Sequence, residues 1–262
     1  MPSPSPEPPI QNRLAPLLIL VLALLQPLAG ALAPAFGIGT PIGAATAGTD
    51  AADQPLPAFF SIWSVIFAAY GAFGIAGLIA PQRWPRPLAR PLILAGAGNI
   101  VWMLSAQLAV LQPLDFVLLF PILIAAWWAA REAEKLRAPG AGIALQIGDA
   151  ASGLLAGWLS VALSISVPLT VRSLTPIAPT DFPWPMFWSA LLPAGLLAWL
   201  FATRVSRSLW YFAAAGWGIL GIAFHNWFDT GMHLIGHIAA GFLLLVLLLR
   251  LTRGSNPVKP AT

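Results

Sequence analysis

All three histidines of the chain lie in one short stretch, at regular spacing with an aspartate. His225, Asp229, His233 and His237 follow one another at four-residue steps. Residues four apart share a helix face, so His233 and His237 could bind a metal, with His225 and Asp229 closing the site across a turn. Zinc or haem iron would suit such ligands. The competing interpretation is a polar turn at a membrane interface, which Asn226 and Asp229 also favour. Because spacing does not fix geometry across a turn, we expect no metal here.

Tryptophan forms the second group of candidates, with 12 in the chain. Trp63, Trp102 and Trp158 fall inside long apolar stretches, where an indole N–H needs a partner. Such residues either pack a helix bundle or line a pocket for a flat apolar ligand, and packing is the commoner role. Asn99 and Gln107, two turns apart in one stretch, are predicted to hydrogen-bond to neighbouring helices.

The elements that position these residues must lie in a membrane. The chain of 262 residues is 58% apolar and only 8% charged, with a mean hydropathy of +0.82. A soluble domain has about 25% charged residues, so most of this surface must face the lipid bilayer. The net charge of +4 does not indicate nucleic acid, because the basic residues flank apolar stretches, where they set orientation. With no cysteine, the chain has no disulfides or thiolate metal sites.

Eight apolar stretches are long enough to cross a hydrocarbon core, which needs about 20 residues per helix. The chain is therefore predicted to be an all-α integral membrane protein with about eight transmembrane helices. Polar, Pro-rich tails at 1–12 and 252–262 are predicted to be disordered. The predicted spans are 14–35, 58–80, 91–111, 116–134, 145–170, 185–203, 208–226 and 231–251.

The connectors between these stretches alternate in charge, which predicts how the chain is threaded. Basic loops stay in the cytoplasm, so both termini are predicted to be cytoplasmic. Arg172 is the one basic residue predicted on the outer side, together with the long loops 36–57 and 171–184. The basic segments hold Arg13; Arg83, Arg86 and Arg90; Arg131, Lys135 and Arg137; Arg204 and Arg207; and Arg250, Arg253 and Lys259; the acidic ones hold Asp50 and Asp53, Asp115, Asp181 and Asp229.

The first stretch has an alternative interpretation as a signal peptide. Arg13, an apolar run and Ala31-Leu32-Ala33 resemble such a segment with its cleavage site. Pro34 directly after the cut and the length of the run favour a membrane helix instead.

Three segments carry a family resemblance. These are Phe60-Ser61-Ile62-Trp63-Ser64-Val65-Ile66-Phe67, Asn99-Ile100-Val101-Trp102 and Gly157-Trp158-Leu159-Ser160-Val161-Ala162. In this order they resemble the TspO/MBR family (tryptophan-rich sensory protein, or translocator protein), in its long bacterial form. The resemblance covers a five-helix domain at 14–170, and the three helices of 171–251 would be an extension. It implies a bacterial inner-membrane location.

The resemblance also implies a function and a site. The expected function is binding, transport or sensing of a flat hydrophobic molecule such as a tetrapyrrole, rather than catalysis. The alternatives are a membrane metalloenzyme of the lipid hydrolase type that uses the four His and Asp residues, and a secondary transporter. Gly153 and Gly157 form a small-residue face that could pack within the bundle or support a homodimer. The implied pocket is lined by Phe60, Trp63, Phe67, Asn99, Trp102 and Trp158.

Overall fold

The computed structural model describes residues 11–44 and 49–253 and contains only helices and loops there. The short helical segments are α2 (Leu32–Phe36), the 3₁₀ turns η1 (Pro57–Ser61) and η2 (Arg86–Leu88), and the π-helical turn η3 (Phe201–Val205). The long helices are α1 (Gln11–Gly30), α3 (Ile62–Ile79), α4 (Ala89–Leu108), α5 (Gln112–Lys135), α6 (Ile143–Leu174), α7 (Pro183–Leu200), α8 (Leu209–Phe228) and α9 (His233–Arg253).

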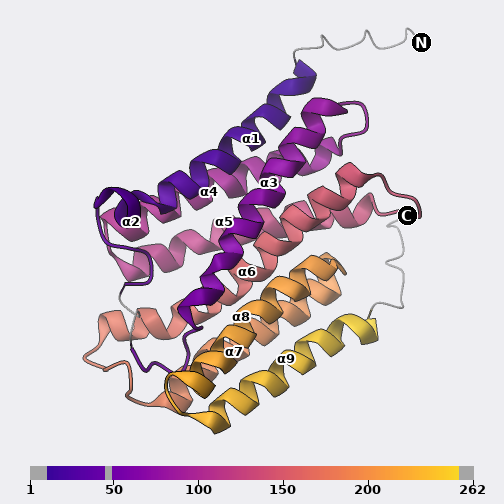
Figure 1. The fold of residues 1–262 in the computed structure, drawn as a ribbon. Helices are drawn as coiled ribbons and strands as arrows, with labels where there is room; N and C mark the ends of the chain where they lie inside the picture. Colours follow the sequence, from indigo (N-terminus) through magenta and orange to yellow (C-terminus); the bar gives the residue numbers. More distant parts are fainter. Residues whose placement is uncertain (1–10, 45–48, 254–262) are drawn as a thin grey trace, which may run out of the picture.

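Helix α6 is the centre of the bundle. It lies between α1, α3, α4 and α5 on one side and α7, α8 and α9 on the other (Figure 1). Every residue from Ala151 to Ser166 is buried. A helix that is apolar on all sides is stable only when neighbours cover all its faces, and α3, α5, α7 and α8 do so here.

Glycines on α6 allow α8 to approach closely. A methyl group at Gly157 would collide with the carbonyl oxygen of Tyr211, and one at Gly153 would lie 2.6 Å from the Ser208 hydroxyl oxygen. Small residues let membrane helices pack backbone to backbone. The Gly153 and Gly157 face is therefore used inside the chain and is not available to a dimer.

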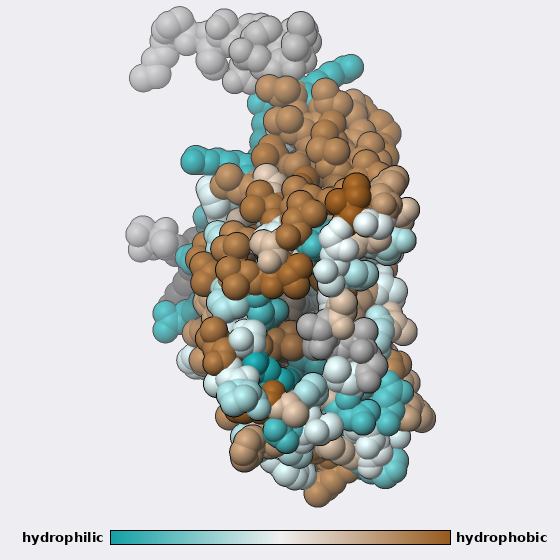
Figure 2. Space-filling model, turned by 90° about the vertical axis from the view of Figure 1, so that its left-hand side faces the viewer, coloured by the Kyte–Doolittle hydropathy of each residue, from teal (hydrophilic) through white to brown (hydrophobic). Residues whose placement is uncertain are grey.

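The outer surface of the bundle is suited to lipid. Seven of the described helical segments are long and apolar enough to cross a membrane, which makes this a multi-pass membrane protein. Helix α8 is not among the seven; it carries Trp, His and Asn side chains, and 12 of its residues are buried. Leu24 on α1, Ile124 on α5 and Leu245 on α9 each expose more than half of their surface. Figure 2 shows large hydrophobic areas above a more hydrophilic region on one face of the molecule.

The two sets of connectors lie at opposite ends of the bundle. At the end that carries the loop after α2, Arg172 forms a buried ion pair with Asp53. At the other end, Glu134 accepts hydrogen bonds from the Ser206 hydroxyl (2.9 Å) and the Arg207 amide (3.1 Å), and Arg137 pairs with Asp149 at 3.1 Å. The one exception to the charge alternation, Arg172, is thus neutralised inside the protein.

The observed helices follow the predicted spans with shifts of a few residues. The predicted first span, 14–35, is interrupted at Ala31, so that α1 and α2 are separate helices. The predicted fifth span, 145–170, is extended at both ends to 143–174. Of the two tails predicted to be disordered, residues 11–12 and 252–253 are helical, and the rest lie outside the described residues.

Candidate functional site

A cavity of about 760 Å³ lies at the end of the bundle where the loop follows α2; we call it the loop-end cavity. Its wall comes from several parts of the chain. Pro27 and Gly30 belong to α1, Asp50 and Gln54 to the loop, and Phe60 to η1, while α2, α3, α4 and α8 complete the wall. This volume is within the range of small-molecule sites, which is roughly 300–1,000 Å³.

One wall of the cavity is aromatic. Phe60, Trp63 and Phe67 line it, and Trp63 stacks on Phe67 with ring centroids 5.6 Å apart. Trp102 stacks on Trp63 at 6.1 Å, and Trp158 meets it edge-on at 6.2 Å. Trp102 and Trp158 are buried and are not part of the wall. They fix the orientation of the Trp63 ring, which is part of the wall.

Asn99 does not line the cavity. It is fully buried and donates a hydrogen bond to Gln26 of α1 at 2.9 Å. Gln107 bonds to the carbonyl oxygen of Ala29 (2.7 Å) and accepts from the amide of Ala33 (2.9 Å), across the break between α1 and α2. The predicted interhelical bonds of Asn99 and Gln107 are therefore confirmed, and both residues fix α1 against α4.

The loop after α2 is held in place by α6 and α8. The Arg172 guanidinium of α6 binds the buried Asp53 carboxylate through both terminal nitrogens. Asn226 of α8 donates to the carbonyl oxygen of Ala52 at 2.8 Å. The adjoining turn is fixed as well, since the Trp217 indole donates to the carbonyl oxygen of Phe59 at 2.7 Å. Helices α6 and α8 therefore hold one side of the loop-end cavity.

The four candidate metal ligands are divided between two places. His225 and Asp229 line the cavity, and His225 Nδ1 lies 3.0 Å from Asp229 Oδ2. His237 instead hydrogen-bonds through Nδ1 to the carbonyl oxygen of His233 and packs its ring against Trp227 at 5.6 Å. Among residues 11–44 and 49–253, no group of three or more His, Asp or Glu residues could hold a metal ion.

Comparison with known protein families identifies the family of the chain. The family model described as TSPO-like protein matches residues 17–252. The chain belongs to this family. Searches among curated proteins and among solved structures found no match. The match covers α6 to α9 as well as the first helices, so the three C-terminal helices belong to the TSPO-like region.

Several residues that shape this TSPO-like site were not identified from the sequence. Met103 of α4 and Gln54 of the loop line the cavity, and Gln26 is the buried partner of Asn99. A glutamine in a membrane helix is costly unless it is bonded, so Gln26 could have been singled out by its type alone. Nothing in the sequence pairs Asp53 with Arg172, which is 119 positions away.

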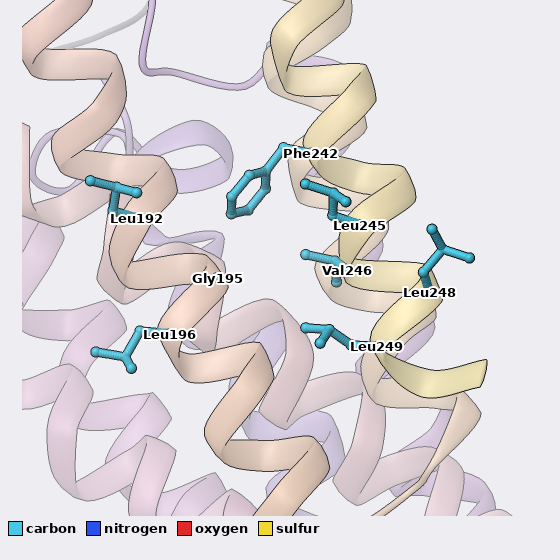
Figure 3. A pocket seen from close by; sticks show the side chains of 8 residues that line it. All are labelled: Leu192, Gly195, Leu196, Phe242, Leu245, Val246, Leu248 and Leu249. Atoms are coloured by element: carbon cyan, nitrogen blue, oxygen red, sulfur yellow. The ribbon is translucent and has the colours of Figure 1, made fainter. Parts of the chain in front are cut away.

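A second cavity of the TSPO-like chain, of about 460 Å³, lies between α7 and α9; we call it the leucine groove. Figure 3 shows its side chains, which are all apolar: Leu192, Gly195, Leu196, Phe242, Leu245, Val246, Leu248 and Leu249. Leu192 and Leu245 are each 59% exposed, so the groove belongs to the apolar outer surface.

Proposed function

We propose that this TSPO-like protein binds a flat hydrophobic molecule, of the size of a tetrapyrrole, in the loop-end cavity. The observation that carries the proposal is the aromatic wall. Trp63 presents its ring to the cavity while Trp102 and Trp158 hold it from behind. Aromatic rings attract flat partners by stacking, and a ring fixed before binding loses little freedom when the ligand arrives.

The place of this cavity in the membrane follows from the charge pattern. With basic connectors in the cytoplasm, both termini are cytoplasmic and the cavity opens to the outer side of a bacterial inner membrane. A site that opens to one side suits capture and sensing of a ligand, and it is also the state from which transport would begin. The family match supports a membrane protein of this type.

A titration with protoporphyrin IX tests the proposal by following quenching of tryptophan fluorescence in the purified protein. We expect saturable quenching. Trp63→Ala should weaken binding by about three- to tenfold, because an aromatic pair contributes about 0.5–1.5 kcal/mol beyond its buried area. Trp102→Phe should have a smaller effect, since Trp102 only supports the wall.

The matched control is Trp199→Phe. Trp199 lies on α7, is 40% exposed and does not line the cavity, so it should change the total fluorescence without changing the dissociation constant. An absence of saturable quenching, or equal dissociation constants for the wild type and Trp63→Ala, would contradict the proposed site.

A further inference from the structure

The polar groups of the loop-end cavity share one chemical property. Among the described residues, those that line it include the carboxylates of Asp50 and Asp229 and no lysine or arginine. The sequence itself contains no basic residue from Leu14 to Gln82, the stretch that supplies most of the wall. The nearby guanidinium of Arg172 is already bound to the Asp53 carboxylate. The charges that line the cavity are therefore negative.

His225 adds a third acceptor. Its side chain is 7% exposed, and Nδ1 faces the Asp229 carboxylate at 3.0 Å. An ionised carboxylate only accepts hydrogen bonds, so in the neutral ring Nδ1 carries the proton and Nε2 carries the lone pair. Nε2 is buried and finds no hydrogen-bond partner among the residues that the structure describes. An unpaired buried acceptor is costly, and a donor from a ligand would remove that cost.

From these observations we infer that the ligand of the loop-end cavity is an aromatic molecule carrying a protonated amine. The inference rests on the proposed function and specifies its ligand class. The flat part of the ligand lies against Trp63, and the ammonium group lies by the carboxylates of Asp50 and Asp229. His225 Nε2 is not itself exposed, so the imidazole turns slightly to accept a hydrogen bond from the ammonium group. A cation is also attracted to the faces of aromatic rings such as Phe60 and Trp63. A carboxylate group on a ligand binds less favourably there than an ammonium group does, because the described residues of the wall include no lysine or arginine to receive it.

Four pyrene probes that differ in one substituent separate these effects. Pyrene, 1-pyrenemethanol, 1-pyrenemethylamine and 1-pyreneacetate share the flat ring system and differ in hydrogen bonding and charge. Dissociation constants are measured by energy transfer from tryptophan to pyrene, with the protein in phosphatidylcholine nanodiscs. We expect the amine to bind roughly tenfold more tightly than the acetate, with pyrene and the alcohol between them.

Three variants assign the preference to the residues. Asp50→Asn and Asp229→Asn should each reduce the preference for the amine over pyrene by roughly two- to fivefold, as for partly exposed charges. His225→Phe should weaken binding of the amine and the alcohol more than it weakens binding of pyrene. Asp181→Asn is the control, because Asp181 is an exposed carboxylate at the same end of the bundle that does not line the cavity.

The outcomes distinguish two failures. If pyrene itself does not bind, the proposed binding function is wrong. If pyrene binds but the acetate binds as tightly as the amine, the cavity is a binding site and the inference about charge is overturned. It is also overturned if Asp181→Asn weakens the amine as much as Asp229→Asn does.

Discussion

The loop-end cavity and the leucine groove differ in the polarity of the residues that line them. The leucine groove is lined by apolar side chains alone, so the acyl chains of a bilayer can fill it without leaving a polar side chain unpaired. The wall of the loop-end cavity includes His225, whose Nε2 is buried without a partner among the described residues. Hydrocarbon cannot satisfy that atom.

This contrast indicates which cavities of a membrane protein are candidate binding sites. In a soluble protein an apolar groove between helices would attract attention as an exposed patch. In a membrane protein such a groove belongs to the ordinary lipid-facing surface. An unsatisfied buried polar atom in the wall is the better indicator, because it represents a free-energy cost that a ligand can remove.

The largest loss of stability and of ligand binding is expected when the ion pair between Arg172 and Asp53 is removed. Arg172→Ala leaves the Asp53 carboxylate buried without its cation, and Asp53 is fully buried. Loss of one partner of a buried pair costs about 3–5 kcal/mol, so we expect a clearly lower unfolding temperature and loss of ligand quenching. Thermal unfolding in detergent and the porphyrin titration measure the two effects.

The control for Arg172 lies at the other end of the molecule. Arg137→Ala removes ion pairs to Asp149 and Glu134, in which the arginine side chain is 40% exposed. Partly exposed pairs of this kind contribute about 1 kcal/mol each, and these lie at the opposite end of the bundle from the cavity, so ligand binding should be unchanged. Equal effects of the two substitutions would show that the Asp53 pair is not what holds the loop.

The contrast between these two arginines also shows what could be predicted from the sequence. Apolar stretches of about 20 residues and the sign of the connectors were enough to predict the eight long helices and the end at which Arg172 lies. They could not show that Arg172 pairs with the buried Asp53, because that contact joins α6 to the loop after α2 through tertiary packing. Local patterns contain no information on such distant pairs.

The candidate site was predictable to a similar extent. Phe60, Trp63 and Phe67 were chosen from one segment of the family resemblance, and all three line the cavity. Trp102 and Trp158 were chosen from the other two segments, but which buried indole faces a cavity depends on the packing of α4 and α6. His225 was considered as a metal ligand with Asp229, His233 and His237, or as part of a polar turn. Its place beside the aromatic wall follows from the docking of α8 on α6.

A smaller effect is expected at the contact between α6 and α8, which brings His225 to the loop-end cavity. Gly157→Ala places a methyl group against the Tyr211 carbonyl and the Ala214 side chain, so α8 must shift. Overpacking of this kind costs about 1–3 kcal/mol. We expect reduced thermal stability and a weaker preference for the pyrene amine, with pyrene itself less affected.

Gly241→Ala is the matched control for Gly157→Ala. Gly241 is also helical, and nothing lies within 4 Å of a methyl group added there. The two variants gain the same helix propensity, so only the collision differs. If both variants showed the same stability and the same probe preference, the α6–α8 contact would not determine the position of His225.

The smallest effect is expected when the leucine groove is filled. Leu196→Phe adds volume to a wall residue that is 55% exposed, so the larger ring can turn toward lipid without straining the core. Stability should change by less than about 0.5 kcal/mol, as for most surface substitutions, and the dissociation constants of protoporphyrin IX and the pyrene probes should not change. The same titrations and thermal unfolding provide the measurement. A severalfold loss of binding in Leu196→Phe would mean that the groove takes part in recognition, and an unpaired polar atom would then not be needed to mark a binding site in this bundle.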